Sequence, residues 1–442
     1  MTVMTKSAEQ FILGVERRDL RVGVVGLGYV GLPLLIEIAN AGFAVRGFDV
    51  DDGKIARLEA GESYIRHIPA AHIAALDRQR VDYTTDFKET VDCDAILICV
   101  PTPLTAHQEP DLTYILRTAD QLGPHVKKGQ LIVLESTTFP GTTREVLAPR
   151  LSELSGLSPE TDFHMAYSPE REDPNNKDFS TRTIPKVVGG MTEVALHMAD
   201  ALYRTVICQT VPVSSCEVAE ATKLMGNIFR CVNIALVNEL KIVFHAMDID
   251  VWEVVNAAKT KPFGYMPFYP GPGLGGHCIP IDPFYLTWKA KEYGIATRFI
   301  ELAGAINTDM PNYVVERTMR ALNEHGKAVR GSRLILIGLS YKANIDDIRE
   351  SPSFVLWRKL EELGAKLDYF DPYCDEVPRT RDHPQFAGIK SKTMADIESG
   401  GYDAALIATG HESVDYAAIS RSVTVVIDTR NVAGVRDNVV KA

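Results

Sequence analysis

Residues 21–31 read RVGVVGLGYVG, a β-rich run that leads through glycines into an apolar helical pattern. Gly26, Gly28 and Gly31 form the spacing G-x-G-x-x-G. In this arrangement the first glycine allows a tight turn, the second lets a pyrophosphate approach the backbone, and the third permits close packing of helix on strand. The stretch therefore predicts a dinucleotide-binding βαβ unit.

Asp49 closes the next β-rich run, 23 residues after Gly26. A carboxylate at that place can accept hydrogen bonds from the adenosine ribose hydroxyls. Its charge would repel a 2′-phosphate, so the sequence favours NAD over NADP. The alternative is a glycine turn that only packs a strand on a helix. The order strand, turn, helix, strand and acid makes that alternative the weaker interpretation.

The composition bounds the class of protein. The chain has 442 residues, of which 45% are hydrophobic and 24% are charged, and these values predict a folded protein of about two or three domains. The formal net charge of −11 disfavours duplex nucleic acid as a partner, because such a partner calls for a basic face. An anionic small molecule would have to be met by local Arg and Lys side chains.

No stretch of the sequence predicts a membrane span or a secretion signal. The longest apolar runs, such as 95–100 and 334–338, are far shorter than the about 18 to 20 residues that cross a bilayer. Residues 1–20 carry charges within their only apolar stretch. The seven cysteines include no C-x-x-C pair, which is typical of a reducing compartment and gives no zinc signature. We therefore expect a cytoplasmic protein without a metal site.

Short β-rich runs alternate with helical stretches from Arg21 onward, and a second such series begins at Arg333. The alternation predicts an α/β fold with two Rossmann-like, doubly wound parallel-sheet domains joined by a long central helix. That helix is predicted to follow Ser214, which forms a capping box with Glu217. The second series, RLILIGLSYKA, echoes RVGVVGLGYVG without its second and third glycines, so it should not hold a dinucleotide in the same manner.

A cysteine lies in the loop GPGLGGHCIPIDP, residues 271–283, between glycines and prolines. Cys278 has no helical or strand periodicity around it, and rigid loops of this kind are disproportionately functional. Asp282 follows four residues later and can orient a water or take a proton near the thiol. Lys223 and Asn227 share one face of the long helix, and a lysine near a thiol lowers the pKa of that thiol and stabilises an oxyanion. Without Cys278, a solvated lysine and a packed asparagine would be the better interpretation of that pair.

A nicotinamide site and a nucleophilic thiol together indicate one chemistry. Hydride acceptance turns an alcohol into an aldehyde, and a thiolate can capture the aldehyde as a thiohemiacetal. A second hydride transfer gives a thioester, which water cleaves to an acid. Two hydrides then leave per substrate.

Eight motifs resemble the UDP-glucose/GDP-mannose dehydrogenase family, in the same order, from about residue 21 to 431. They are VGVVGLGYVGLPL, ICVPTP, ESTTFPGTT, YSPERE, AEATKLMGN, GGHCIPIDP, GLSYKANIDDIRESP and IDTRN. The resemblance implies an NAD-binding domain at 1–212, a central long helix, dimerisation region and cysteine loop at 213–310, and a UDP-sugar-binding domain at 311–442. It further implies a homodimer whose substrate is a UDP-sugar.

The resemblance also implies a role for each matching residue. Cys278 would be the nucleophile, Lys223 and Asn227 would hold the oxyanion, and Asp282 would help the water or the thiol. Thr137 would lie near the nicotinamide, and Glu170 would act as acid or base. The cofactor-binding candidates are Gly26, Gly28, Tyr29, Val30, Gly31, Asp49, Thr102, Thr137 and Arg349. The substrate-binding candidates are Glu170, Arg171, Lys223, Asn227, Gly275, Tyr341, Lys342 and Arg430.

The glucose-specific members usually read SPEFLxE where this chain reads SPEREDP, so a second family glutamate has only Glu172 and Asp173 as candidates. SPEREDPNN and GPGLGGHCIPIDPFYL resemble the branch that oxidises UDP-N-acetylhexosamines for bacterial surface polysaccharides, most closely on UDP-N-acetylglucosamine. UDP-glucose, UDP-GalNAc and UDP-ManNAc remain alternatives, because epimers differ only in the orientation of one group. A 3-hydroxyacid dehydrogenase and an NAD-sensing binding protein are further alternatives, and neither requires Cys278.

Overall fold

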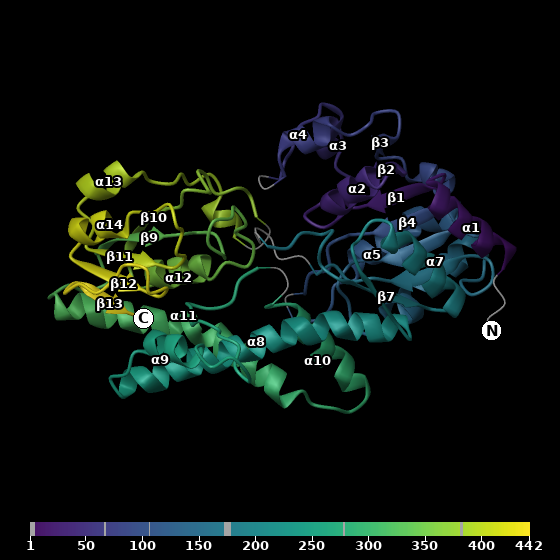
Figure 1. Cartoon of the computed structure of the whole chain (residues 1–442). Coiled ribbons are helices and arrows are strands. Elements are labelled where there is room, and N and C mark those ends of the chain that lie inside the picture. The colour runs from purple at the N-terminus through teal and green to yellow at the C-terminus, as the bar shows by residue number, and fades with distance from the viewer. Residues whose placement is uncertain (1–4, 66–67, 106, 172–177, 277–278, 381–382) are drawn as a thin grey trace. The chain divides into compact units, whose positions relative to one another are not determined.

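The computed structural model describes residues 5–65, 68–105, 107–171, 178–276, 279–380 and 383–442 (Figure 1). The chain divides into two compact units. The first comprises Met1–Gly226 and Phe284–Ile295, and the second comprises Asn227–Pro283 and Ala296–Ala442. Each unit is described by itself.

The first unit is built on an eight-stranded sheet in the order β3-β2-β1-β4-β5-β6-β7-β8. Its neighbouring strands are parallel except for β6 and β7, which pair antiparallel. The strands are β1 (Arg21–Val25), β2 (Ala44–Phe48), β3 (Val81–Thr84), β4 (Ala95–Ile98), β5 (Leu131–Leu134), β6 (His164–Tyr167), β7 (Lys186–Gly190) and β8 (Thr210–Val213).

Helices cover both faces of this sheet, because alternate residues of its central strands enter two separate cores. On β4, Ala95 and Leu97 belong to one core, and Ile96 and Ile98 belong to the other. The main helices of the unit are α1 (Lys6–Arg17), α2 (Gly31–Asn40), α3 (Asp52–Glu59), α4 (Ala70–Ala74), α5 (Thr113–Leu122), α6 (Ala148–Ser155) and α7 (Glu193–Arg204). The predicted doubly wound fold is confirmed.

A long helix, α8 (Cys216–Ala246), follows β8 and is drawn in teal in Figure 1. It has 31 residues, as the unbroken apolar periodicity predicts. The predicted cap at Ser214 is wrong by one residue. Because α8 begins at Cys216, the residue directly before it is Ser215, whose hydroxyl accepts a hydrogen bond from the Val218 N–H at 3.3 Å.

The second unit is built on a parallel five-stranded sheet in the order β10-β9-β11-β12-β13. Its strands are β9 (Arg333–Ile337), β10 (Lys366–Phe370), β11 (Ala404–Ile407), β12 (Val425–Asp428) and β13 (Val439–Lys441). Residues of β9 alternate between two cores, so this sheet is also covered on both faces. The other helices are α9 (Val251–Ala258), α10 (Asp282–Glu292), which runs into the first unit, α11 (Arg298–Glu324), α12 (Pro352–Glu362), α13 (Met394–Ser399) and α14 (Tyr416–Ser422).

None of the helices in the described parts of the chain is both long and apolar enough to cross a membrane.

Candidate active site

The candidate residues of the first unit collect at one edge of its sheet. Gly26 follows β1, Asp49 follows β2, Thr102 follows β4, Thr137 follows β5, and Glu170 follows β6. These five strands run parallel, so their carboxyl ends face the same side. Strand order reverses between β1 and β4, and the crevice outside such a reversal is where open α/β sheets bind ligands.

The glycine turn after β1 has the geometry that a dinucleotide needs. Gly26 has φ +89°, a left-handed conformation that only glycine adopts freely. A Cβ on Gly31 would lie 1.9 Å from the Gly26 carbonyl oxygen. The start of α2 can therefore approach the turn this closely only because residue 31 is glycine. Around a Cβ placed on Gly28, by contrast, no described atom lies within 4 Å. Gly28 therefore leaves the backbone open to a pyrophosphate.

The start of α2 adds a second favourable feature. Val30 precedes it, and among the described residues no side chain caps its first N–H groups. The Leu32 N–H donates to the Gly28 carbonyl oxygen at 3.1 Å, and Pro33 has no N–H, so the helix dipole at this N-terminus is what favours phosphate. Tyr29 and Val30 are partly buried in the turn that precedes it. The residues present fit NAD.

Asp49 is held in place by its own neighbours. One carboxylate oxygen accepts hydrogen bonds from the Leu27 N–H at 2.9 Å and from the Lys54 ammonium at 3.1 Å. The other accepts from the Asp51 N–H at 3.1 Å. Lys54, in α3, was missed by the sequence analysis, although a lysine five residues after the acid was visible there. Its charge offsets part of the charge of Asp49.

Lys223 and Glu170 meet in the first unit. The Lys223 ammonium donates to the Glu170 carbonyl oxygen at 2.5 Å and lies 3.6 Å from its carboxylate. The side chains are only 9% and 19% exposed, respectively. A cation and a carboxylate so close in a mostly dry place can exchange a proton and can stabilise developing negative charge. Arg171, next to Glu170, is exposed and donates to the Pro185 carbonyl oxygen at 3.0 Å.

Two buried carboxylates that the sequence analysis missed hold these segments. Glu220, one turn before Lys223 on α8, accepts hydrogen bonds from the Gly141 N–H at 2.6 Å and from both the N–H and the hydroxyl of Thr143 at 2.9 and 2.7 Å. Burial raises the pKa of Glu220 to about 7, against these hydrogen bonds, which lower it. Glu220 thereby ties α8 to the segment that follows ESTTFP.

Glu135, the first residue of ESTTFPGTT, is the second of these carboxylates. It accepts from the Lys186 ammonium at 2.7 Å and from the Tyr203 hydroxyl. Lys186 also donates to the Pro169 carbonyl oxygen at 3.4 Å. This ion pair therefore joins the backbone beside Thr137 to the backbone beside Glu170.

Asn227 and Asp282 meet in the second unit. The Asn227 amide donates a hydrogen bond to the carboxylate of Asp282, and both side chains are buried. Asp282 is the first residue of α10, where the helix dipole favours its negative charge. Cys278, Glu172 and Asp173 lie outside the described residues, so their predicted roles stay predictions.

The glycines of the cysteine loop pack on the candidate substrate residues. A Cβ on Gly275 would lie 2.5 Å from the Tyr341 Cβ, and one on Gly276 would lie 2.9 Å from the Tyr341 ring. A Cβ on Gly271 would lie 2.6 Å from the Arg430 guanidinium. Glycine is therefore required where Gly275 meets the Tyr341 Cβ, whereas at Gly271 the close atom is the end of the Arg430 side chain. Lys342, next to Tyr341, is partly exposed.

Arg430 and Arg349 differ in how they are held. Burial lowers the pKa of Arg430 to about 10, so the guanidinium stays charged at neutral pH but is poorly solvated. Such a cation favours an anionic ligand. Arg349, which is exposed, forms a two-point ion pair with Asp347, at 2.9 and 2.6 Å. Its predicted contact with the cofactor stays a prediction.

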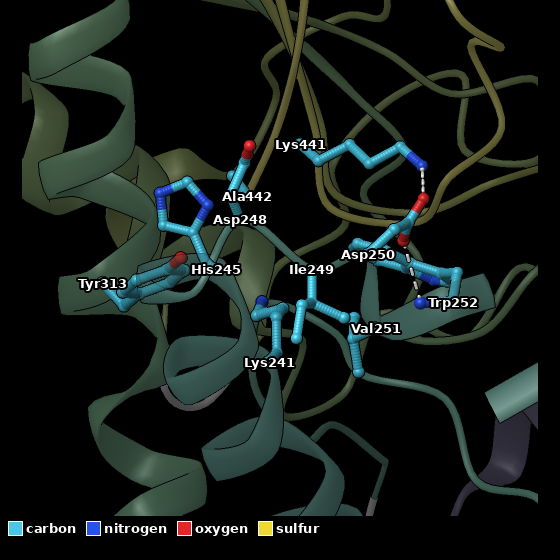
Figure 2. Close-up of a pocket in the computed structure, with 10 residues that line it drawn as sticks. All are labelled: Lys241, His245, Asp248, Ile249, Asp250, Val251, Trp252, Tyr313, Lys441 and Ala442. Atoms are coloured by element: carbon cyan, nitrogen blue, oxygen red, sulfur yellow. Dashed lines mark hydrogen bonds and ion pairs between the residues drawn. The ribbon is translucent and has the colours of Figure 1, made fainter. Parts of the chain in front are cut away.

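A pocket of about 210 Å³ lies in the second unit, and it is lined by none of those predicted site residues that the structure describes (Figure 2). The lining residues are Lys241, His245, Asp248, Ile249, Asp250, Val251, Trp252, Tyr313, Lys441 and Ala442. The Lys241 ammonium donates to the Gly271 carbonyl oxygen at 3.4 Å, and Asn238 accepts from the Gly271 N–H at 3.0 Å. Burial, and then Arg430 and Arg317, lower the pKa of Lys241 to about 7. These two α8 residues therefore support the start of the cysteine loop.

Family models match three successive parts of the chain. The NAD binding domain of the UDP-glucose/GDP-mannose dehydrogenase family matches residues 20–207, its central domain matches 217–309, and its UDP binding domain matches 335–435. The chain belongs to this family, as its motifs indicated. It is an NAD-dependent UDP-sugar 6-dehydrogenase.

Individual relatives agree with this class. UDP-N-acetyl-D-glucosamine 6-dehydrogenase of Pseudomonas aeruginosa is 38% identical over 395 residues, which cover 89% of this chain and 91% of that protein. UDP-N-acetyl-D-mannosamine dehydrogenase of Pyrococcus horikoshii is 32% identical over 421 residues, which cover 93% and 96%. The solved structure of UDP-D-ManNAc dehydrogenase from Pyrococcus horikoshii has a TM-score of 0.84 at 31% identity and covers 95% of this chain and 96% of that one. The fold and the NAD cofactor predicted from the sequence are thus confirmed.

Proposed function

We propose that the chain oxidises the C6 hydroxyl of a UDP-N-acetylhexosamine, most readily UDP-N-acetylglucosamine, to the uronic acid. The observation that carries this choice is the 38% identity to the Pseudomonas aeruginosa enzyme across 89% of the chain, against 32% for the mannosamine enzyme. SPEREDPNN and the cysteine loop support the N-acetylhexosamine branch. UDP-glucose, UDP-GalNAc and UDP-ManNAc are the competing substrates.

The proposed mechanism assigns each step to residues of this chain. NAD, when bound at the Gly26–Gly31 turn, supplies a hydride acceptor at C6. Cys278 attacks the aldehyde carbon, and Lys223 and Asn227 stabilise the oxyanion that this attack creates. Asp282, placed by Asn227, receives or returns the proton of the attacking water or thiol, while Glu170 handles the proton of the sugar hydroxyl. Thr137 orients the reacting carbon, and Tyr341, Lys342, Gly275, Arg171 and Arg430 hold the UDP-sugar.

Incubation with a panel of UDP-sugars tests this function. We expect two NADH per UDP-N-acetylglucosamine consumed, with a uronic acid as product, little free aldehyde and the highest kcat/KM of the panel. The first hydride leaves when the alcohol becomes an aldehyde, and the second leaves when the thiohemiacetal becomes a thioester, which water then hydrolyses without further oxidation. NADH is counted by absorbance and the product by mass spectrometry. A ratio of one would exclude the thioester route, and a higher kcat/KM for another epimer would overturn the substrate assignment alone.

Cofactor choice gives a second prediction. Asp49→Asn should lower kcat/KM for NAD by about tenfold, because a charged acceptor for the ribose hydroxyls is lost. NADP should be affected less, since Lys54 loses its carboxylate partner and can meet a 2′-phosphate. The measurement is kcat/KM with each cofactor. Asp52→Asn, which removes the same charge from the exposed start of α3, is the matched control. Equal use of NAD and NADP by the unaltered protein would contradict the role of Asp49.

The proposed assembly is a cytoplasmic homodimer formed through α8, with domain boundaries at 1–212, 213–310 and 311–442. Phe229, Leu236 and Val243 are seven residues apart on α8 and are 44%, 53% and 46% exposed. Residues at this spacing lie on one helical face, and an apolar face of this kind favours a partner helix. The central-domain match at 217–309 includes this face.

A further inference from the structure

In both units a glycine turn follows one strand and donates a hydrogen bond to the end of the neighbouring strand. Gly26 after β1 has φ +89°, and Gly338 after β9 has φ +85°. Each donates its N–H to the last residue of the adjacent strand at 2.8 Å. Beyond those strands lie Asp49 and Asp371, and each accepts the N–H of the residue after its glycine, at 2.9 and 2.6 Å. Asp371 is therefore the counterpart of the acid that the first unit offers to NAD.

The two acids differ in what covers them. Asp49 pairs with Lys54, whose side chain is partly exposed. Asp371 is covered by His411, and both side chains are fully buried, with 3.2 Å between the imidazole Nε2 and the carboxylate. The other ring nitrogen, Nδ1, accepts the Asn344 N–H at 3.0 Å, so Nε2 carries the proton and donates to Asp371. His411 thus joins an acid at one strand end to a turn at another.

That turn is fixed by hydrogen bonds at its end. Asn344 has φ +63°, in the left-handed region that asparagine adopts more readily than other residues with a side chain. Its N–H is bound by His411, and its side-chain oxygen accepts the Glu412 N–H at 3.0 Å. Thr409 adds a hydrogen bond to the Ser340 carbonyl oxygen at 2.5 Å. The segment after β11 therefore fixes both ends of the turn 340–344, and a turn held at both ends can present its side chains to a ligand in one arrangement.

The turn carries Tyr341 and Lys342, the pair proposed to hold the UDP-sugar. Tyr341 also packs against Gly275 and Gly276, which lie in the cysteine loop three and two residues before Cys278. A shift of the turn would therefore displace substrate contacts and the support of the cysteine loop together.

We infer that His411 is a positioning residue for the UDP-sugar, which acts by joining Asn344 to Asp371 and so fixing the turn that carries Tyr341 and Lys342. The inference rests on the proposed function, because that proposal gives Tyr341 and Lys342 their role. His411 touches neither reacting atom in this scheme. It covers Asp371, the counterpart of Asp49, so this acid is not open to the ribose hydroxyls of a dinucleotide.

Three substitutions separate the two contacts of the ring. His411→Leu removes both, His411→Asn keeps an acceptor where Nδ1 stood, and His411→Gln keeps a donor that reaches toward Asp371. UDP binding is measured by calorimetry on the full chain, together with NAD binding. We expect the UDP affinity of His411→Leu to be about tenfold weaker than that of the unaltered protein. The affinity of His411→Asn should recover to within about threefold of the unaltered protein, and that of His411→Gln should recover little. NAD affinity should be unchanged, because Gly26 and Asp49 belong to the first unit.

The controls make each outcome decisive. His164→Leu removes another buried imidazole, on β6, and should leave UDP affinity unchanged. UDP affinity of His411→Leu equal to that of the unaltered protein would overturn the inference, as would rescue by Gln without rescue by Asn. If the second unit of His411→Leu does not fold, the circular dichroism and the thermal unfolding of the full chain will reveal it, and the comparison of Asn with Gln still decides. An unaltered protein that binds NAD but not UDP would instead refute the proposed function, on which this inference rests.

Discussion

Cys278→Ala is expected to abolish acid formation while NAD and the UDP-sugar still bind. The sulfur is the only group assigned to hold the substrate covalently between the two hydride transfers, and neither ligand depends on it for its main contacts. Loss of a catalytic nucleophile lowers turnover by about 10⁴-fold or more. The measurement is NADH formation and uronic acid yield, beside calorimetric binding of both ligands. Near-normal acid production by a folded variant that binds both ligands would show that hydration of a free aldehyde carries the second step.

Cys278→Ser gives a complementary result. A serine oxygen can still be acylated, but an ester is hydrolysed more slowly than a thioester, so a sugar ester on residue 278 should accumulate and be visible by mass spectrometry. Cys208→Ala is the matched control, because Cys208 is an exposed thiol of the first unit. The control should retain full turnover.

The features that could be predicted from the sequence are those that depend on residues close together along the chain. The turn at Gly26 and Gly31 is specified within eleven residues, and the structure shows the steric reason: a Cβ on Gly31 would lie 1.9 Å from the Gly26 carbonyl oxygen. The position of Asp49 could be predicted because this acid directly follows the short apolar run that forms β2. The burial of both sheets on both faces likewise follows from short, continuous apolar runs such as AILI of β4 and LIVL of β5.

The parts that the sequence did not predict depend on partners far away along the chain. Glu220 binds Gly141 and Thr143, and His411 binds Asp371, 40 residues before it. A polar residue within an apolar stretch can be recognised in the sequence, but the distant residue that it binds cannot. The antiparallel pairing of β6 and β7 was missed for a related reason, because a short apolar run such as KVVGG does not indicate the direction of the strand beside which it pairs.

Lys223→Met is expected to lower kcat by about a hundred- to a thousand-fold, the usual cost of removing one donor from an oxyanion site. Methionine keeps the unbranched length and apolar volume of the side chain, so α8 should keep its packing while the charge beside Glu170 is lost. UDP-sugar KM should change far less, because the proposed oxyanion exists only after the thiol has attacked. NAD affinity should not change.

Glu170 makes this result interpretable. The Lys223 ammonium lies 3.6 Å from its carboxylate, so removal of either side chain leaves the other without that partner. If the two act together, Lys223→Met combined with Glu170→Gln should cost less than the product of the single losses. Lys128→Met removes a lysine that is 74% exposed and paired with Asp162, and it should leave kcat unaltered. A Lys223→Met enzyme that keeps kcat within about tenfold of the unaltered protein would show that the ammonium only holds the Glu170 backbone and that the oxyanion is stabilised elsewhere.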